Sequence, residues 1–243
     1  MQKTMTTFGF QKGRILSQKY EIIDLLGSGY EGEVYKIKER ATDIFRAAKF
    51  FFPNRNHGNI SLKNYAKKLH RLSECPILVQ YKTTEFVQHK GQKLPYLVSD
   101  FIDGILLSTF VTRFPGKRLP YYHGLSFFYE LVEGLSQVHD RKSFHGDIHS
   151  DNVMIHSFGL KHKMKLIDFH DIGVDKRIKM KEDIHDIIYL FHEILGGSKH
   201  YKNHPEEIKY ILCGKKRNVI DERFKNMRQL KLHIENMRFR SIL

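Results

Sequence analysis

Three polar residues in the middle of the chain have the types and the spacing that phosphoryl transfer requires. Asp147 is followed five residues later by Asn152, and Asp168 comes at the end of a later apolar run, 164–167. A carboxylate can take the proton of an attacking hydroxyl, while an amide oxygen and a second carboxylate suit Mg2+. The stretch from Phe144 to Ile155 is therefore one around which a phosphotransferase could be built.

A glycine-rich segment upstream could hold the phosphates. Gly27, Gly29 and Gly32 separate two strand-like segments, 20–26 and 33–38, and Val34 lies two residues past the last glycine. Bare backbone N–H groups can approach an anion closely at such a turn. The spacing alone is weak evidence, because a glycine-rich turn can be purely structural. A strand after the glycines, where a dinucleotide fold would have a helix, is the arrangement typical of kinases.

The next strand-like segment, 45–52, contains one interior charge, Lys49. A buried unpaired ammonium is costly, so this lysine requires a partner or a ligand anion unless it points to solvent. With the glycine-rich segment before it, phosphate anchoring is the favoured interpretation.

The remaining pattern predicts a strand-rich first part and a helical second part. A helix is expected at 61–73, strands at 77–81, 83–89 and 96–99, and a connector at 100–104. After the connector, helices are expected at 105–114, 121–141 and 184–195, and then two or three short ones, with one beginning near Pro205 and one over 224–237. A domain boundary is expected at the connector.

Composition predicts a globular protein that is soluble and cytoplasmic. The 243 residues are 41% hydrophobic, the two cysteines lack metal-ligand spacing, and no apolar window is long enough for a membrane span. The formal net charge is +14, and residues 199–243 hold twelve Lys or Arg against five Asp or Glu. This surplus could attract an acidic or polyanionic partner, although a solvated basic helical face is the simpler interpretation. The sequence contains neither a His-Glu-x-x-His nor a Gly-x-Ser-x-Gly motif, which argues against a zinc protease or a serine hydrolase.

Together these motifs resemble the eukaryotic-like protein kinase family, in order and at suitable spacing, from about Tyr20 to the C-terminus. The resemblance implies an α+β, bilobal fold with a small antiparallel β-sheet lobe carrying one helix and a larger, mainly helical lobe. We expect a polar N-terminal lead-in at 1–19, a small lobe at 20–99, a hinge at 100–104 and a large lobe at 105–243.

The resemblance also implies a role for each matching residue. Asp147 would orient the substrate hydroxyl and accept its proton, with Lys49, Asn152 and His149 completing the catalytic set. Asn152 and Asp168 would bind Mg2+. Asp183 would support the backbone of the catalytic loop, with Asp186 as the alternative. ATP would contact the glycine-rich turn, the β-sheet and the hinge, through Gly27, Ser28, Gly29, Gly32, Val34, Ala47, Lys49, Ser99, Asp100 and Ile102.

Four departures from the family pattern stand out. Ala66 occupies the position of the helix glutamate that normally pairs with the lysine, so Asp168, Glu31, Glu33 or the nucleotide must balance Lys49. Gly146 replaces the arginine that normally reads a phosphorylated activation loop. Few residues separate Asp168 from Asp183, which argues against control by activation-loop phosphorylation, and His170 replaces the glycine after Asp168 and Phe169.

Three functions follow from this pattern. The first is a compact Ser/Thr protein kinase of the bacterial, eukaryotic-like type that transfers the γ-phosphate of ATP, with Mg2+, to an unidentified protein substrate. The second is a small-molecule kinase, because the loop with His149 is also similar to that of aminoglycoside and choline kinases. The third is a nucleotide-binding pseudokinase that serves as an interaction module, which Ala66 suggests.

Overall fold

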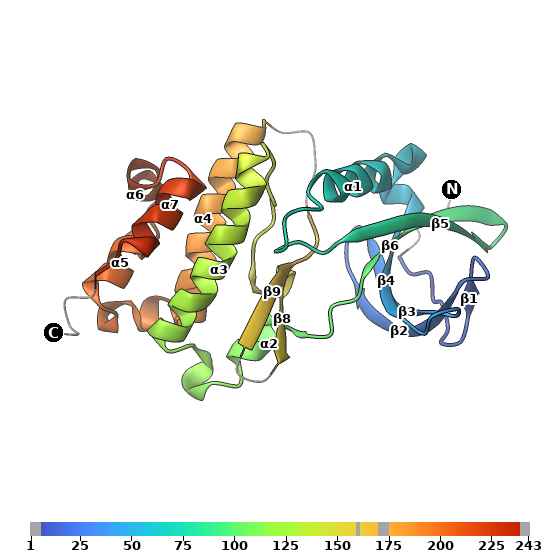
Figure 1. Cartoon of the computed structure of the whole chain (residues 1–243), viewed down its shortest axis with the longest axis horizontal. Coiled ribbons are helices and arrows are strands. Elements are labelled where there is room, and N and C mark those ends of the chain that lie inside the picture. The colour runs from blue at the N-terminus through green and yellow to red at the C-terminus, as the bar shows by residue number, and fades with distance from the viewer. Residues whose placement is uncertain (1–5, 159–160, 170–174, 239–243) are drawn as a thin grey trace. The chain divides into compact units, whose positions relative to one another are not determined.

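The computed structural model describes residues 6–158, 161–169 and 175–238, and the chain divides into two compact units (Figure 1). Unit 1 comprises Met1–Glu74 and Val79–Ile102, and unit 2 comprises Cys75–Leu78 and Asp103–Leu243. Within the described ranges, no helix has the length and apolar character needed to cross a membrane.

Unit 1 is an antiparallel six-stranded sheet with one α-helix. The strand order is β1-β2-β3-β4-β6-β5. In chain order the elements are β1 (Ile15–Leu16), β2 (Tyr20–Ser28), β3 (Gly32–Glu39), β4 (Phe45–Phe51), the 3-10 turns η1 (Pro53–Arg55) and η2 (His57–Asn59), α1 (Ile60–Arg71), β5 (Tyr81–His89) and β6 (Gln92–Asp100). Side chains alternate between the two faces of a strand, so Ala48 and Phe50 enter the core while Lys49 points to the other face.

The N-terminal segment belongs to the core of unit 1, so its interpretation as a polar lead-in is wrong. Phe8 and Phe10 are buried, and their rings stack on each other with centroids 5.4 Å apart. Phe10 also packs edge-on against Phe50, and Phe8 stacks on Phe52. Two aromatic residues in a polar segment are too few to form a periodic pattern, yet they cover one face of the sheet.

Unit 2 is mainly helical, with a three-stranded sheet in the order β7-β8-β9. The strands are β7 (Ile105–Leu106), β8 (Val153–Phe158) and β9 (Lys161–Leu166), and the helices are α2 (Leu107–Val111), α3 (Tyr121–Asp140), α4 (Lys176–Ile194), α5 (Glu206–Leu212), α6 (Arg217–Arg223) and α7 (Met227–Glu235). Short 3-10 turns lie between them: η3 (Pro115–Lys117), η4 (Ser150–Asn152), η5 (Gly197–Lys199), η6 (Tyr201–Asn203) and η7 (Cys213–Lys215).

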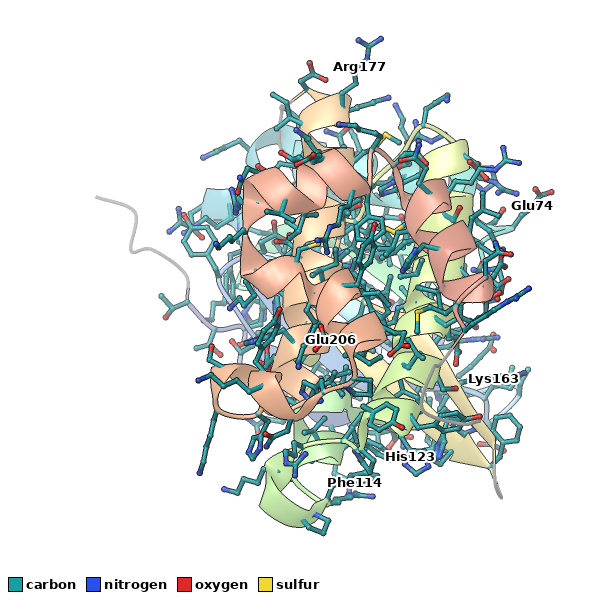
Figure 2. All side chains as sticks on the ribbon, turned by 90° about the vertical axis from the view of Figure 1, so that its left-hand side faces the viewer. Glu74, Phe114, His123, Lys163, Arg177 and Glu206 are labelled. Carbon is teal, nitrogen blue, oxygen red and sulfur yellow. The ribbon has the colours of Figure 1, made fainter. Side chains whose placement is uncertain are left out.

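The two long helices form the centre of unit 2. Phe128 of α3 and Phe191 of α4 stack with their centroids 4.2 Å apart. Figure 2 shows α5, α6 and α7 at the end of this unit, with Glu206 at the start of α5, and α7 packs along α3. The predicted α+β class, with a sheet unit carrying one helix and a mainly helical unit, is confirmed.

Three predicted elements differ from the structure. The strand expected at 77–81 is absent, because Ile77 packs against Gly134 of α3 and Leu78 forms a single bridge to Leu166. The helix expected at 105–114 is divided into β7, which pairs with β8, and the short helix α2. Helix α4 begins eight residues earlier than expected, where Asp175 caps it by accepting a hydrogen bond from the Arg177 N–H.

Candidate active site

The loop after α3 holds the Asp147 carboxylate through the side chain of Asn152. The Asn152 amide nitrogen donates to the Asp147 backbone carbonyl at 2.9 Å and to its carboxylate oxygen Oδ2 at 3.0 Å. Both acceptors lack hydrogens, so the nitrogen of the amide must face them and its oxygen, Oδ1, points the other way. Asn152 therefore orders the carboxylate with one end and presents an oxygen ligand at the other.

The backbone of this loop is held by Asp183, as expected. Asp183 is fully buried in α4, and its two carboxylate oxygens accept the backbone N–H groups of His145 and Gly146, both at 2.8 Å. Nε2 of His139 lies 2.9 Å from the same oxygen that accepts from His145. Asp183 thus fulfils the supporting role, and Asp186 is not needed for it. His139 has a structural contact and not a catalytic one.

His145 joins this loop to the segment that carries Asp168. Its Nε2 lies 3.0 Å from the Ile167 carbonyl, and its ring packs 4.7 Å from that of Phe169, which is buried. Asp168 itself has a φ of 55°, in the left-handed region that aspartate tolerates better than most residues. This joint fixes the backbone immediately before the second predicted Mg2+ ligand.

The donor set of this loop fits a hard divalent cation. Asn152 Oδ1 and the Asp168 carboxylate are oxygen ligands of the kind that Mg2+ prefers, and Mg2+ usually takes one or two protein oxygens and completes its shell with phosphates and water. No cluster of three or more His, Cys, Asp or Glu side chains that could hold a metal occurs among the described residues. A site made of two protein oxygens plus nucleotide phosphates agrees with both facts.

In unit 1, strand register brings the predicted nucleotide residues to one face of the sheet. Val34 pairs with Lys49, and Ala47 pairs with Ser99. Cross-strand partners share a face, and so do residues two apart in a strand, so these four side chains lie on the same side. The core aromatic residues cover the opposite face. Small side chains beside a lysine leave room on this face for a flat ring and its phosphates.

Glycine is required for different reasons at the different positions of the turn between β2 and β3. A Cβ at Gly32 would lie 1.8 Å from the Phe50 carbonyl oxygen, so the neighbouring strand requires glycine there. A Cβ at Gly27 or Gly29 would meet nothing within 4 Å. The turn is closed by the Gly29 N–H, which donates to the Gly32 carbonyl at 2.9 Å. Packing within the chain therefore leaves Gly27 and Gly29 unexplained, whereas the close approach of a phosphate would account for both.

Lys49 has an acidic partner in the glycine-rich turn. Its Nζ lies 3.5 Å from the Glu31 carboxylate, and it lies over the rings of Tyr65 and Phe51, at 4.6 and 5.1 Å from their centroids. Glu33, the other acid proposed from that turn, is buried and instead accepts hydrogen bonds from the Phe8 N–H and the Tyr35 hydroxyl. Of the candidates considered from the sequence, Glu31 is thus a partner of Lys49.

Asp100, at the end of β6, is tied to its surroundings by its side chain and its N–H. Its carboxylate pairs with Arg46 at 2.6 Å and with Lys82 at 3.2 Å, and its N–H donates to the Gln80 carbonyl. Any contact of Asp100 with a nucleotide would therefore use its carbonyl. Ile102 is half-buried, at the end of the same unit.

Comparison with known proteins decides the family. Residues 20–214 match the model of the protein kinase domain. The chain belongs to the protein kinase family. This kinase also resembles solved structures: the kinase domain of PknI from Mycobacterium tuberculosis superimposes with a TM-score of 0.65 at 17% identity, over 93% of this chain and 98% of that one. The predicted family and the bilobal kinase fold are confirmed.

The curated relatives of this kinase are distant in sequence. Cell division control protein 2 homolog C of Antirrhinum majus is 26% identical over 196 residues, which is 76% of this chain and 63% of the relative. Cyclin-dependent kinase B2-1 of Oryza sativa subsp. japonica is 27% identical over 205 residues, 80% of this chain and 60% of the relative. The chain spans about three fifths of the length of these relatives.

The departures of this kinase from the family pattern have local explanations. Gly146 has a φ of 89°, a conformation that glycine adopts without strain, and its N–H is one of the two held by Asp183. The aromatic ring of Tyr65, next to Ala66 on α1, lies over Lys49. His170 lies outside the described residues. The sequence did not predict this cation–π contact, because Tyr65 lies 16 residues from Lys49 and on a different element.

Proposed function

We propose that this kinase transfers the γ-phosphate of ATP to a serine or threonine hydroxyl of a protein. The observation that carries the proposal is the arrangement of Asp147, Asn152 and Asp183 in a chain whose residues 20–214 match the protein kinase domain. A carboxylate held by an amide, on a loop held by a buried carboxylate, is a base fixed in position, and positioning together with charge neutralisation accounts for most of phosphoryl-transfer catalysis.

The reaction can be written with the residues in their proposed roles. The substrate oxygen forms a bond to the γ-phosphorus, the bond from that phosphorus to the β,γ-bridging oxygen breaks, and its electron pair stays on ADP. The hydroxyl proton passes to the Asp147 carboxylate. Lys49 would bind the α- and β-phosphates as a point charge, and the N–H groups of the turn from Gly27 to Gly32 would contact the phosphates.

The remaining predicted residues would contact the adenine ring or the Mg2+ ion. Val34, Ala47 and Ser99 would line the adenine site, Ser28 would contribute its backbone, and Asp100 and Ile102 would offer backbone groups to the base. Mg2+ would be held by Asn152 Oδ1 and the Asp168 carboxylate. When bound, it neutralises the charge that develops on the phosphate oxygens.

The ion pair of Lys49 with Glu31 bears on whether the chain is a pseudokinase. In the absence of a helix glutamate, a carboxylate from the glycine-rich turn supplies a countercharge to the lysine. Because this turn would also contact the phosphates, nucleotide binding and the position of the lysine would be coupled. This favours an active enzyme over a nucleotide-binding pseudokinase that serves as an interaction module.

The test is phosphate transfer from radiolabelled ATP with Mg2+ to the chain itself and to added proteins. Wild type should label protein, and Asp147→Asn should lower the rate by about 100-fold or more, the size expected for loss of a general base. Asp140→Asn, an exposed acid at the end of α3, is the matched control and should keep full activity. Label that appears only on an added metabolite would establish a small-molecule kinase. Nucleotide-dependent thermal stabilisation without any transfer would establish a pseudokinase.

The charge balance suggests which protein substrates to try. With a formal net charge of +14, the chain should associate faster with acidic proteins than with basic ones. We therefore propose an acidic substrate or partner. An acidic test substrate such as casein should be phosphorylated with a lower KM than a histone, and the difference should shrink between 50 and about 300 mM salt, since exposed charges are screened. Equal KM values at low salt would contradict this.

A further inference from the structure

The catalytic loop contains a His-x-Asp pattern twice in succession, and both copies form the same hydrogen bond. The copies are His145-Gly146-Asp147 and His149-Ser150-Asp151. In each, the ring nitrogen Nδ1 of the histidine lies 3.3 Å from the backbone nitrogen of the aspartate two residues later. A backbone N–H can only donate, so each Nδ1 must be an acceptor without a hydrogen.

This contact decides the tautomer of both histidines. A neutral imidazole with a bare Nδ1 carries its hydrogen on Nε2. For His145 the conclusion has an independent check, because its Nε2 faces the Ile167 carbonyl at 3.0 Å and a carbonyl can only accept. For His149 the same rule places an N–H at Nε2, and this atom lies 3.5 Å from Oδ2 of Asp147.

The Asp147 carboxylate is therefore approached from one side by two donors. The Asn152 amide donates to Oδ2 at 3.0 Å, and Nε2 of His149 lies 3.5 Å from the same oxygen. The contacts of both groups with the carboxylate are to Oδ2. The side chains of Asp147 and His149 are 47% and 46% exposed, so a substrate can reach the second oxygen.

We propose that His149 is a positioning residue for Asp147. The Asp151 N–H fixes the Nε2–H tautomer of His149, and this N–H, together with Asn152, keeps Oδ2 occupied so that Oδ1 receives the proton of the substrate hydroxyl. The proposal rests on the proposed function for its consequence, although the tautomer can be measured without any activity.

Two further hydrogen bonds hold the turn that carries Asp151. The Ser108 hydroxyl of α2 donates to the Asp151 carboxylate, and the Ser150 hydroxyl donates to Glu193 of α4 at 2.9 Å. The turn η4 is thus attached to α2 through Asp151 and to α4 through Ser150. Because the N–H that selects the tautomer belongs to this turn, Ser108 acts on Asp147 through Asp151 and His149.

The first test is NMR of the full chain with 15N-labelled histidine. Long-range proton–nitrogen spectra distinguish the two neutral tautomers, and the signal of His149 is assigned as the one lost in His149→Asn. The Nε2–H form is expected. An Nδ1–H form, or an even mixture of the two, would overturn the proposal, whatever the enzyme does with ATP.

The second test uses substitutions to distinguish the roles of the two nitrogen atoms of the His149 ring. In His149→Asn the side-chain oxygen can still accept from the Asp151 N–H, but nothing replaces Nε2. In His149→Gln the amide nitrogen can reach the place of Nε2. We expect kcat to fall about tenfold in the Asn variant and about threefold or less in the Gln variant, with the KM for ATP unchanged in both.

Two further variants complete the design. His123→Asn, an exposed histidine of α3 that lies near Phe114 in Figure 2, is the matched control and should keep the wild-type kcat. Ser108→Ala should lower kcat by a few fold without changing the melting temperature by more than about 2 °C. Equal kcat values in His149→Asn and wild type would overturn the proposal. If wild type transfers no phosphate to any protein, the proposed function fails, and the NMR result alone then decides the tautomer.

Discussion

Replacing Asp183 by asparagine should loosen the catalytic loop, and the cost can be worked out from three contacts. In the wild type, Oδ2 of Asp183 accepts from the His145 N–H and faces Nε2 of His139, while Oδ1 accepts from the Gly146 N–H. An asparagine keeps one oxygen and turns an NH2 group toward the other donor. In its better orientation one buried backbone N–H loses its acceptor, which costs about 1–3 kcal/mol. Loss of the charge on the remaining bonds adds about 1 kcal/mol.

The free energy of unfolding of Asp183→Asn should therefore fall by about 2–4 kcal/mol, as measured by urea unfolding followed by circular dichroism. At a temperature where the variant is still folded, kcat should fall at least tenfold because Asp147 is carried by the loosened loop. The KM for ATP should change less than kcat, because the residues predicted to contact the nucleotide directly belong to unit 1 and Asp183 belongs to unit 2. A variant within about 0.5 kcal/mol of wild type, with the same kcat, would refute this reasoning.

Asp186→Asn, on the same helix, is the control, and it should change the free energy of unfolding in the opposite direction. Burial, and next the neighbouring Asp183 carboxylate, raise the pKa of Asp186 to about 6. A carboxyl whose pKa is higher in the folded state than in the unfolded state costs stability above its unfolded pKa, so here the cost grows from about pH 4 and is complete above about pH 6. The asparagine variant should be more stable by about 1–2 kcal/mol at pH 8 after allowance for solvent screening, and the gain should vanish by pH 4. A loss of stability at pH 8 would show that Asp186 has a supporting role of its own.

Three further predictions concern the glycine-rich turn and the histidines. Gly32→Ala should destabilise the chain by more than about 2 kcal/mol, because its Cβ would lie 1.8 Å from the Phe50 carbonyl oxygen, whereas Gly29→Ala should keep its melting temperature and raise the KM for ATP. Glu31→Gln should raise the KM for ATP about threefold or more through Lys49, with Lys49→Met more severe; unchanged KM values would exclude the pair from nucleotide binding. Burial, and then nearby cations or histidines, lower the pKa of four histidines, His89, His192, His204 and His233. The unfolded chain therefore takes up protons first, and the free energy of unfolding should fall as the pH drops below about 6.5. A urea midpoint that stays constant between pH 7 and 5 would contradict this.

The parts of the fold that the sequence predicted are those with strong local signals. The long apolar face of α3 and the alternation around Lys49 each specify an element without knowledge of the rest of the chain. Ile77 and Leu78 show the limit of such signals. Two apolar residues before a real strand look like its beginning, but they pack against α3 and β9, and only the tertiary structure determines that choice.

In the candidate site, residues with fixed spacing along the chain were predictable, and pairs formed across the chain were not. The loop from His145 to Asn152 carries its motif in eight consecutive residues, and Asp183 could be proposed from its place in the family pattern. The partner of Lys49 was left open among several acids, since the fold of the glycine-rich turn decides which carboxylate faces the ammonium. The contact of Ser108 with Asp151 had no sequence signal, because a serine in a short helix is common and its partner lies 43 residues away.

The buried N-terminal segment has a practical consequence for where this chain can be cut. The match to the kinase domain begins at residue 20, but Phe8 and Phe10 lie over Phe50 and Phe52, and the Phe8 N–H donates to the carboxylate of Glu33. A chain shortened to the matched residues would expose an aromatic surface and leave Glu33 without one of its donors, next to the glycine-rich turn. The unit that folds is therefore longer than the unit that the family match delimits, and attempts to trim the protein for crystallisation or expression should retain at least residue 6 onward.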